Sequence, residues 1–217
     1  MKKLILLLSF VPFLVSAQRE GHVVGESANI YFQRWGTGKP ILIVGELGYS
    51  SVAYEHIARQ LSKHNQVIIY DQRGTGKTRV PHLPKNGPAY LAKCKEDLRS
   101  VLNVLKLSQA LFLVVGNGKL VVDDLITEHA DKVLGYIEIS AGRTDTLGRS
   151  LPVISLLGRV PTRPTPQWAN VPSITFQTIR DFHIPEVETF LNRNGLTIAD
   201  AKTSSSQRSR NISRKRH

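Results

Sequence analysis

Short apolar runs alternate with amphipathic stretches along most of the chain. The apolar runs have the length of buried strands and are bounded by glycine-containing turns. They predict strands at 25–36, 40–45, 66–71, 110–116 and 133–140. The helical period of apolar residues recurs between them, at 51–64, 90–106 and 120–132. This alternating order predicts an α/β fold with a mainly parallel sheet flanked by helices.

The pattern loosens in the C-terminal third. Residues 142–170 contain several prolines and predict a loop or a reduced cap, with a short helix around 151–160. Residues 171–181 have the pattern of a further strand, and residues 185–195 have the pattern of a short helix. We therefore expect one folded domain over residues 18–200.

The first 17 residues have the composition of an export signal. Two lysines precede an apolar run, and the run ends in the small residues Ser16 and Ala17, which a signal peptidase accepts. The run is short for a membrane span and is interrupted by Pro12. We predict a signal peptide at residues 1–17, a secreted or periplasmic location and no transmembrane anchor after cleavage.

The formal net charge of +12 is concentrated near the chain ends. Residues 204–217 contain five Lys or Arg residues and no acid. The sequence therefore predicts a disordered basic tail over residues 201–217. Such a tail can touch anionic surfaces, but no nucleic-acid recognition motif accompanies it, so we predict no specific nucleic-acid partner.

Cys94 is the only cysteine of the chain. An intramolecular disulfide and a cysteine-based metal site are therefore excluded. Because Cys94 falls within a helical pattern, we expect it to be a small buried apolar residue. No metal and no cofactor are predicted.

Residues 68–78, with the sequence IIYDQRGTGKT, end like a phosphate-binding loop. The Walker A pattern requires glycine at position 71, but Asp71 stands there. Prolines follow where a helix should begin and present its N-terminus to the phosphate. The pattern therefore does not favour ATP binding.

A longer segment gives this motif another interpretation. YDQRGTG (70–76) matches Tyr-Asp-Gln-Arg-Gly-x-Gly at every position, and VGELGYSS (44–51) takes the place of His-Gly-Gly-Pro-Gly. With 111–140 and 171–185 following in order, the chain resembles the α/β-hydrolase fold, most closely the branch that contains the proline iminopeptidases. The resemblance is good over residues 28–141 and weaker after them.

The resemblance implies a serine nucleophile on a strand-to-helix turn, a histidine and a carboxylate. The place of the nucleophile falls on Gly118, which has no side chain to attack a carbonyl, although a small deletion here is equally compatible. The place of the histidine falls near 203–207, where TSSSQ stands. Asp181 is the counterpart of the acid, but an Asp at a strand end is more often a cap or turn former.

The resemblance also implies an oxyanion region after the second predicted strand. Gly45 and Gly48 match the family there, whereas Val44 replaces the histidine and Glu46 brings an acid. A negative side chain would oppose the charge that such a site stabilises.

We interpret Asp71 and Arg73 as a structural ion pair that ties neighbouring loops together. Gly74 and Gly76 are expected to let the chain turn sharply away from the sheet.

Three functions stay open at this point. The first is an exported, catalytically inactive protein that binds a small-molecule or peptide ligand. The second is an active hydrolase of ester or peptide bonds with a rearranged site that includes Asp181. The third is a non-catalytic binding protein that uses the basic tail. The sequence does not indicate the oligomeric state, and the abrupt change after Lys202 leaves a truncated or frame-shifted C-terminal part open.

Overall fold

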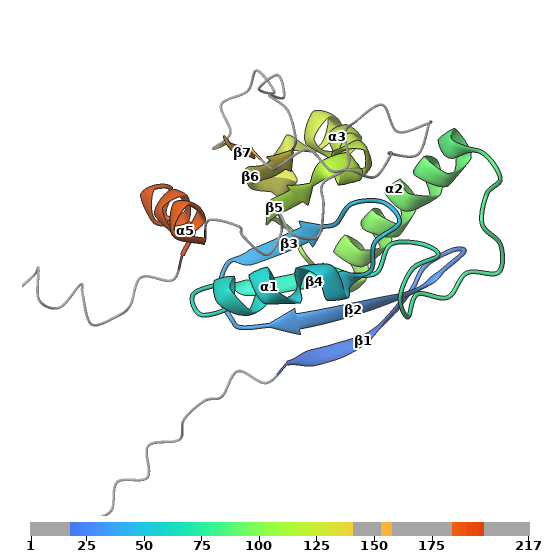
Figure 1. Cartoon of the computed structure of the whole chain (residues 1–217), viewed down its shortest axis with the longest axis horizontal. Helices are drawn as coiled ribbons and strands as arrows, with labels where there is room; N and C mark the ends of the chain where they lie inside the picture. Colours follow the sequence, from blue (N-terminus) through green and yellow to red (C-terminus); the bar gives the residue numbers. More distant parts are fainter. Residues whose placement is uncertain (1–17, 141–152, 158–183, 198–217) are drawn as a thin grey trace, which may run out of the picture.

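Seven strands form one mixed sheet in the computed structural model, which describes residues 18–140, 153–157 and 184–197 (Figure 1). The strand order is β1-β2-β4-β3-β5-β6-β7. The strands are β1 (Arg19–Val24), β2 (Asn29–Trp35), β3 (Pro40–Val44), β4 (Gln66–Tyr70), β5 (Ala110–Val115), β6 (Val133–Ser140) and β7 (Val153–Leu157). β2 runs antiparallel to both of its neighbours, and the pairs from β4 to β7 are parallel.

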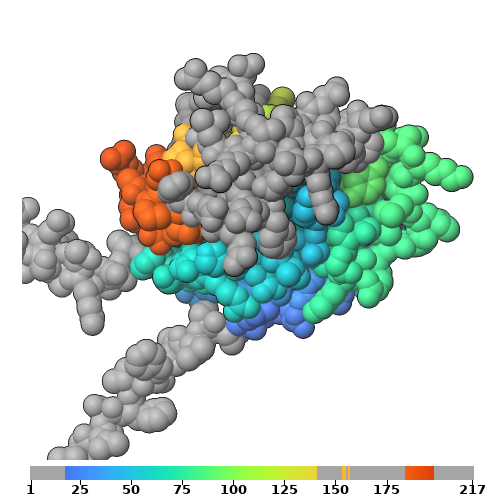
Figure 2. Space-filling model, in the orientation of Figure 1, coloured from blue at the N-terminus to red at the C-terminus, as the bar shows by residue number. Residues whose placement is uncertain are grey.

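Helices cover both faces of this sheet. They are α1 (Glu55–Leu61), α2 (Gly87–Val104), α3 (Lys119–Glu128) and α5 (Ile184–Arg193). Three short 3-10 helices precede or follow them, η1 (Ser51–Tyr54), η2 (Gly116–Gly118) and η3 (Ala130–Lys132). α2 and α3 pack on one face, and α1 and α5 pack on the other. In the space-filling view, α5 lies beside α1 at one end of the molecule (Figure 2).

The central strands are apolar on both sides because each side faces a helical layer. In β3, Leu42 and Val44 belong to the core under α2 and α3, while Ile41 and Ile43 belong to the core under α1 and α5. All six residues of β5 are buried. This explains why the central strands are continuous apolar runs in the sequence.

The predicted fold class is confirmed by the structure. The helix predicted at 185–195 is also found, as α5. The short helix expected around 151–160 is wrong, because Val153–Leu157 is strand β7 and pairs in parallel with β6. β1 was missed, since its sequence REGHVV is mostly polar at the edge of the sheet.

Several predictions lie outside the described residues. They concern the signal peptide, the strand at 171–181, the basic tail and the part of 142–170 other than β7. Over the ranges that the structure does describe, no helix combines the length and the apolar character that crossing a membrane requires.

Cys94 faces the core from α2 and is fully buried. Burial raises the pKa of its thiol to about 12. Since the thiolate is the reactive form, we expect the native protein to resist iodoacetamide at about pH 8. Intact mass spectrometry should show alkylation only after unfolding in guanidinium chloride. Rapid alkylation of the native protein would contradict the buried position.

Candidate functional site

The carboxyl ends of β3, β4 and β5 meet at one edge of the sheet, where open α/β sheets bind their ligands. Three connections start there: the loop from Gly45 to η1, the loop from Asp71 to α2, and the turn Gly116–Gly118 before α3. The site is built from the contacts among these connections.

The turn after β5 bends sharply at Gly116. Gly116 directly follows the strand and has a φ of 52°, a left-handed conformation that favours glycine. Gly118 is different, with φ −57° and ψ −21°, and lies in the right-handed helical region at the start of α3. Gly116 is therefore the residue of this strand-to-helix turn whose backbone conformation favours glycine.

Gly118 is held against the end of β3. A Cβ atom on Gly118 would lie 2.4 Å from the carbonyl oxygen of Gly45 and 2.8 Å from that of Val44. These are main-chain atoms of a buried strand end, which cannot move aside as a flexible side chain can. The backbone approach therefore requires glycine at 118.

The side chain of Glu46 covers Gly116. Its Oε1 atom lies 2.8 Å from the position that a Cβ on Gly116 would take, and Glu46 is only 1% exposed. A buried carboxylate thus takes up the space into which any side chain at position 116 would project.

The main-chain N–H groups after β3 have partners within the protein. The N–H of Glu46 donates to Oη of Tyr54 at 2.7 Å, and the N–H of Leu47 donates to Oδ1 of Asn117 at 2.6 Å. Tyr54 and Asn117 are both buried, and burial raises the pKa of the Tyr54 hydroxyl. Both donors are therefore engaged.

The two glycines predicted for the oxyanion region have different surroundings. A Cβ on Gly45 would lie 2.2 Å from Cε2 of Tyr54, so this position has no room for a side chain. Gly48 has a φ of 88° and nothing within 4 Å of a would-be Cβ. A side chain at position 45 is thus excluded by packing, whereas glycine at position 48 is favoured by its backbone conformation.

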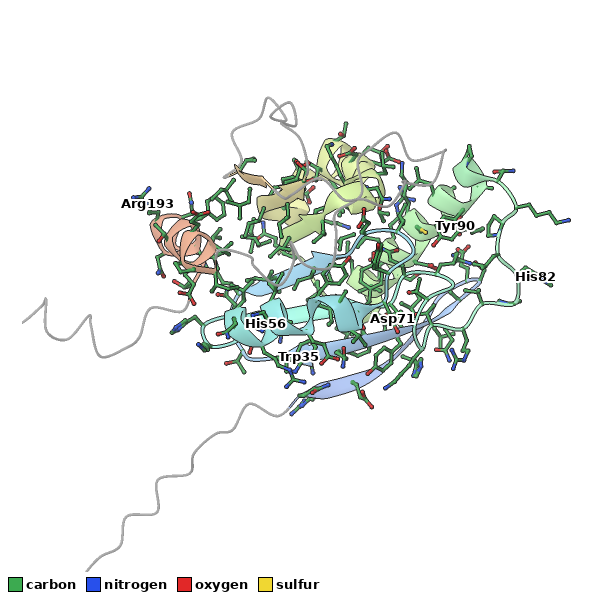
Figure 3. All side chains as sticks on the ribbon, in the orientation of Figure 1. Trp35, His56, Asp71, His82, Tyr90 and Arg193 are labelled. Carbon is green, nitrogen blue, oxygen red and sulfur yellow. The ribbon has the colours of Figure 1, made fainter. Side chains whose placement is uncertain are left out.

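Asp71 organises the loop after β4. Its carboxylate accepts the main-chain N–H groups of Ser51 and Lys77, each at 2.6 Å. Gly76 has a φ of 50° and lies so close that its Cβ would be 2.1 Å from Oδ2 of Asp71. Figure 3 shows Asp71 beside the start of α1, where it joins the loops after β3 and β4.

Arg73 has a different partner from the one the sequence suggested. Its Nε and Nη2 atoms donate to the two carboxylate oxygens of Asp97 at 3.0 and 2.6 Å, and Ser27 accepts two further hydrogen bonds. The predicted ion pair between Asp71 and Arg73 is therefore wrong, because each side chain is engaged elsewhere. Gly74, with a φ of 77°, turns the chain after this buried arginine, as expected for a glycine.

Asp97 was not singled out in the sequence, although a signal was present. It stands on α2 three residues after Cys94 and one before Leu98, on the apolar face of the helix. A charged residue on such a face requires a buried partner. Burial raises the pKa of Asp97 to about 6, although Arg73 lowers it.

The places of the other two members of the predicted triad, Asp181 and the stretch 203–207, lie outside the described residues. The histidines within the described ranges are all exposed: His22, His56, His64, His82 and His129. Figure 3 shows His82 on the outer side of the loop before α2, away from the sheet. Over the same ranges, no group of three or more His, Cys, Asp or Glu could hold a metal ion.

No family model and no curated protein matches the sequence. Solved structures do match it. A laboratory-evolved variant of potato epoxide hydrolase aligns with TM-score 0.53 and 18% identity over 59% of this chain and 41% of that protein. The haloalkane dehalogenase of Agrobacterium tumefaciens C58 aligns with TM-score 0.52 and 19% identity over 57% of this chain and 41% of that protein. A mutant epoxide hydrolase of Vigna radiata aligns with TM-score 0.51 and 21% identity over 57% of this chain and 38% of that protein.

These neighbours are members of one fold family, and this chain has the mostly parallel sheet flanked by helices that is typical of that family. The chain has the α/β-hydrolase fold. It spans about two fifths of the length of the matched structures. At these identities the likeness establishes the fold alone.

In the α/β-hydrolase fold, the turn after β5 and the loop after β3 have known roles in catalysis. In its serine enzymes the nucleophile stands on the sharp turn after β5, and the oxyanion hole uses the next N–H group and an N–H group from the loop after β3. In this chain the turn consists of Gly116, Asn117 and Gly118, and the N–H groups of Glu46 and Leu47 are bonded internally. At this edge of the sheet, the two N–H groups that follow β3 are thus bonded to the chain's own side chains.

Proposed function

We propose that this chain is an exported α/β-hydrolase-fold protein without serine-hydrolase activity, which binds a small-molecule or peptide ligand. The observation that carries the proposal is the turn after β5. Neither Gly116, which has the left-handed conformation, nor Gly118, where the resemblance places the nucleophile, has a side chain. Covalent catalysis requires a nucleophilic side chain at this turn.

The residues next to the two glycines do not replace the missing nucleophile. Asn117 has an amide, which is not nucleophilic, and its Oδ1 is engaged with Leu47. Nζ of Lys119 is engaged in an ion pair with Oδ1 of Asp123, one turn further along α3.

A cavity at the same edge supports ligand binding. It has a volume of about 290 Å³ and adjoins Leu47 and Gly48, with Leu83, Pro84 and Tyr90 in its walls. Ligand sites are typically concave and mostly apolar, with a few polar groups. This volume suits a small, largely apolar molecule or one side chain of a peptide.

Activity-based labelling tests the loss of catalysis. We expect no labelling of the mature protein by a fluorophosphonate probe, and no turnover of proline-based or ester-based chromogenic substrates. A known serine hydrolase serves as the positive control, and heat-denatured protein serves as the control for non-specific reaction. Labelling of the native protein, or turnover that Asp181→Ala abolishes, would establish the active hydrolase instead.

The proposal also includes export of the protein and a relationship to the proline iminopeptidases. The charged start, apolar run and small residues of 1–17 support a signal peptide, and YDQRGTG (70–76) supports a place near the proline iminopeptidase branch. N-terminal sequencing of the secreted protein should begin at Gln18. Retention of the full N-terminus would contradict cleavage after Ala17.

A further inference from the structure

The cavity of about 290 Å³ beside the loop after β3 has an apolar wall that the protein leaves partly uncovered. Leu47 in this wall is 3% exposed and belongs to the core, but Leu83 is 50% exposed. The side chain of Leu83 lies over Gly74, with Cδ2 2.9 Å from the position that a Cβ on Gly74 would take. A half-exposed leucine beside a cavity offers apolar surface to a ligand.

Two of the three polar side chains in the walls are occupied. The hydroxyl of Tyr90 donates to the main-chain oxygen of Arg73 at 2.8 Å, so Tyr90 has its ring left for packing. Oδ1 of Asn86 accepts the N–H of Ala89 at 2.8 Å and caps α2. The third is Lys85, which has no ion pair or side-chain hydrogen bond with any residue that the structure describes.

The connection that carries Lys85 is positively charged. Between Asp71 and Glu96 the sequence has six Lys or Arg residues and no Asp or Glu. Four of these cations have carboxylate partners: Arg73, Lys77, Lys93 and Lys95. The walls of the cavity contain Lys85 and no acidic residue. A concave surface with a cation and no acid attracts anions.

We infer that the cavity binds a small apolar carboxylate, whose hydrocarbon part lies against Leu47 and Leu83 and whose carboxylate accepts a hydrogen bond from Lys85. A lysine suits this task, because its stem can lie along an apolar wall while its ammonium group stays at the rim. The inference rests on the proposed function, since it names the chemistry of the ligand proposed there.

Titrations of the full chain with hexanoate and with hexanamide, followed by ¹H–¹⁵N NMR, test the inference. The two compounds have nearly the same shape, but only hexanoate is charged. We expect the wild-type protein to bind hexanoate about three- to five-fold more tightly, the range expected for an exposed ion pair. Lys85→Met keeps the apolar stem and removes the charge, so it should bind both compounds equally.

Lys63→Met is the matched control. Lys63 is also an exposed lysine, but it lies between α1 and the start of β4, at the opposite edge of the sheet. This variant should keep the preference for hexanoate. A preference that survives in Lys85→Met, or that disappears in Lys63→Met, would overturn the inference.

The same titrations separate failure of the inference from failure of the proposed function. Equal binding of hexanoate and hexanamide by the wild-type protein, weakened for both by Leu83→Ala, would overturn the preference for an acid and keep the cavity as a ligand site. Binding of neither compound would overturn both the inference and the cavity as the ligand site. Fluorophosphonate labelling tests catalysis independently of these outcomes.

A carboxylate beside an apolar group occurs in free short-chain acids and at the C-terminus of peptides. N-acetylglycyl-leucine and its C-terminal amide form a second pair of probes, which presents the carboxylate on a peptide. Under the inference the acid of this pair also binds more tightly than its amide, and Lys85→Met removes the difference. The tighter of the two acids then identifies the source of the ligand.

Discussion

Replacement of Asp97 by alanine is expected to lower the free energy of unfolding by about 3–5 kcal/mol. Arg73 would remain 2% exposed with its charge, and its two hydrogen bonds to the carboxylate would be lost. The pair is ionised at about pH 7.5, because the pKa of Asp97 is about 6. Urea denaturation followed by circular dichroism, at constant m-value, measures the difference.

Asp124→Ala is the matched control for this experiment. Asp124 pairs with Lys95 across α2 and α3 at 2.6 Å, but its side chain is 42% exposed. Exposed pairs contribute at most about 1 kcal/mol. Equal losses for the two variants would show that the pair formed by Arg73 and Asp97 is not buried in solution.

The second large effect is expected at Gly118. We expect Gly118→Ala to destabilise the protein by about 3 kcal/mol or more, at the upper end of the cost of overpacking. The added methyl group would lie 2.4 Å from the carbonyl oxygen of Gly45. Since Gly118 has an ordinary helical φ, this cost comes from the close contact and not from the backbone conformation.

Gly48→Ala separates the cost of a close contact from the cost of an unfavourable backbone conformation. Gly48 has a φ of 88° but nothing within 4 Å of its would-be Cβ, so alanine there suffers only the unfavourable conformation. That conformation costs about 1–2 kcal/mol. Urea denaturation of both variants gives the comparison. A Gly118→Ala protein as stable as the wild type would show that the loop after β3 can withdraw from the turn.

The sequence predicted the layers of this fold because their signals are local. A strand buried on both faces is a continuous apolar run, as at 110–116, and an amphipathic helix repeats over a few turns, as at 90–106. The strands that it missed or mistook lie at the two ends of the strand order. β1 is mostly polar, and β7 lies within a proline-containing stretch, so neither has a clear strand period.

The candidate site was predicted less well, because its contacts join residues far apart in sequence. The sequence placed Asp71 and Arg73 two positions apart and suggested that they pair. The structure joins Arg73 to Asp97 on the next helix. Likewise, the sequence indicated that Glu46 is an acid at an unfavourable place, but only the packing of two connections shows that it covers Gly116.

The contact between Glu46 and Gly116 also constrains how this chain could change over evolutionary time. A serine introduced at position 116 would meet the carboxylate before it met a substrate, since its Cβ would lie 2.8 Å from Oε1 of Glu46. A serine introduced at position 118 would meet the backbone of β3. A side chain at position 116 would therefore require the flexible Glu46 carboxylate to move or to be shortened, whereas a side chain at position 118 would require the main chain after β3 to move. The two glycines thus differ in how readily each position could come to carry a side chain.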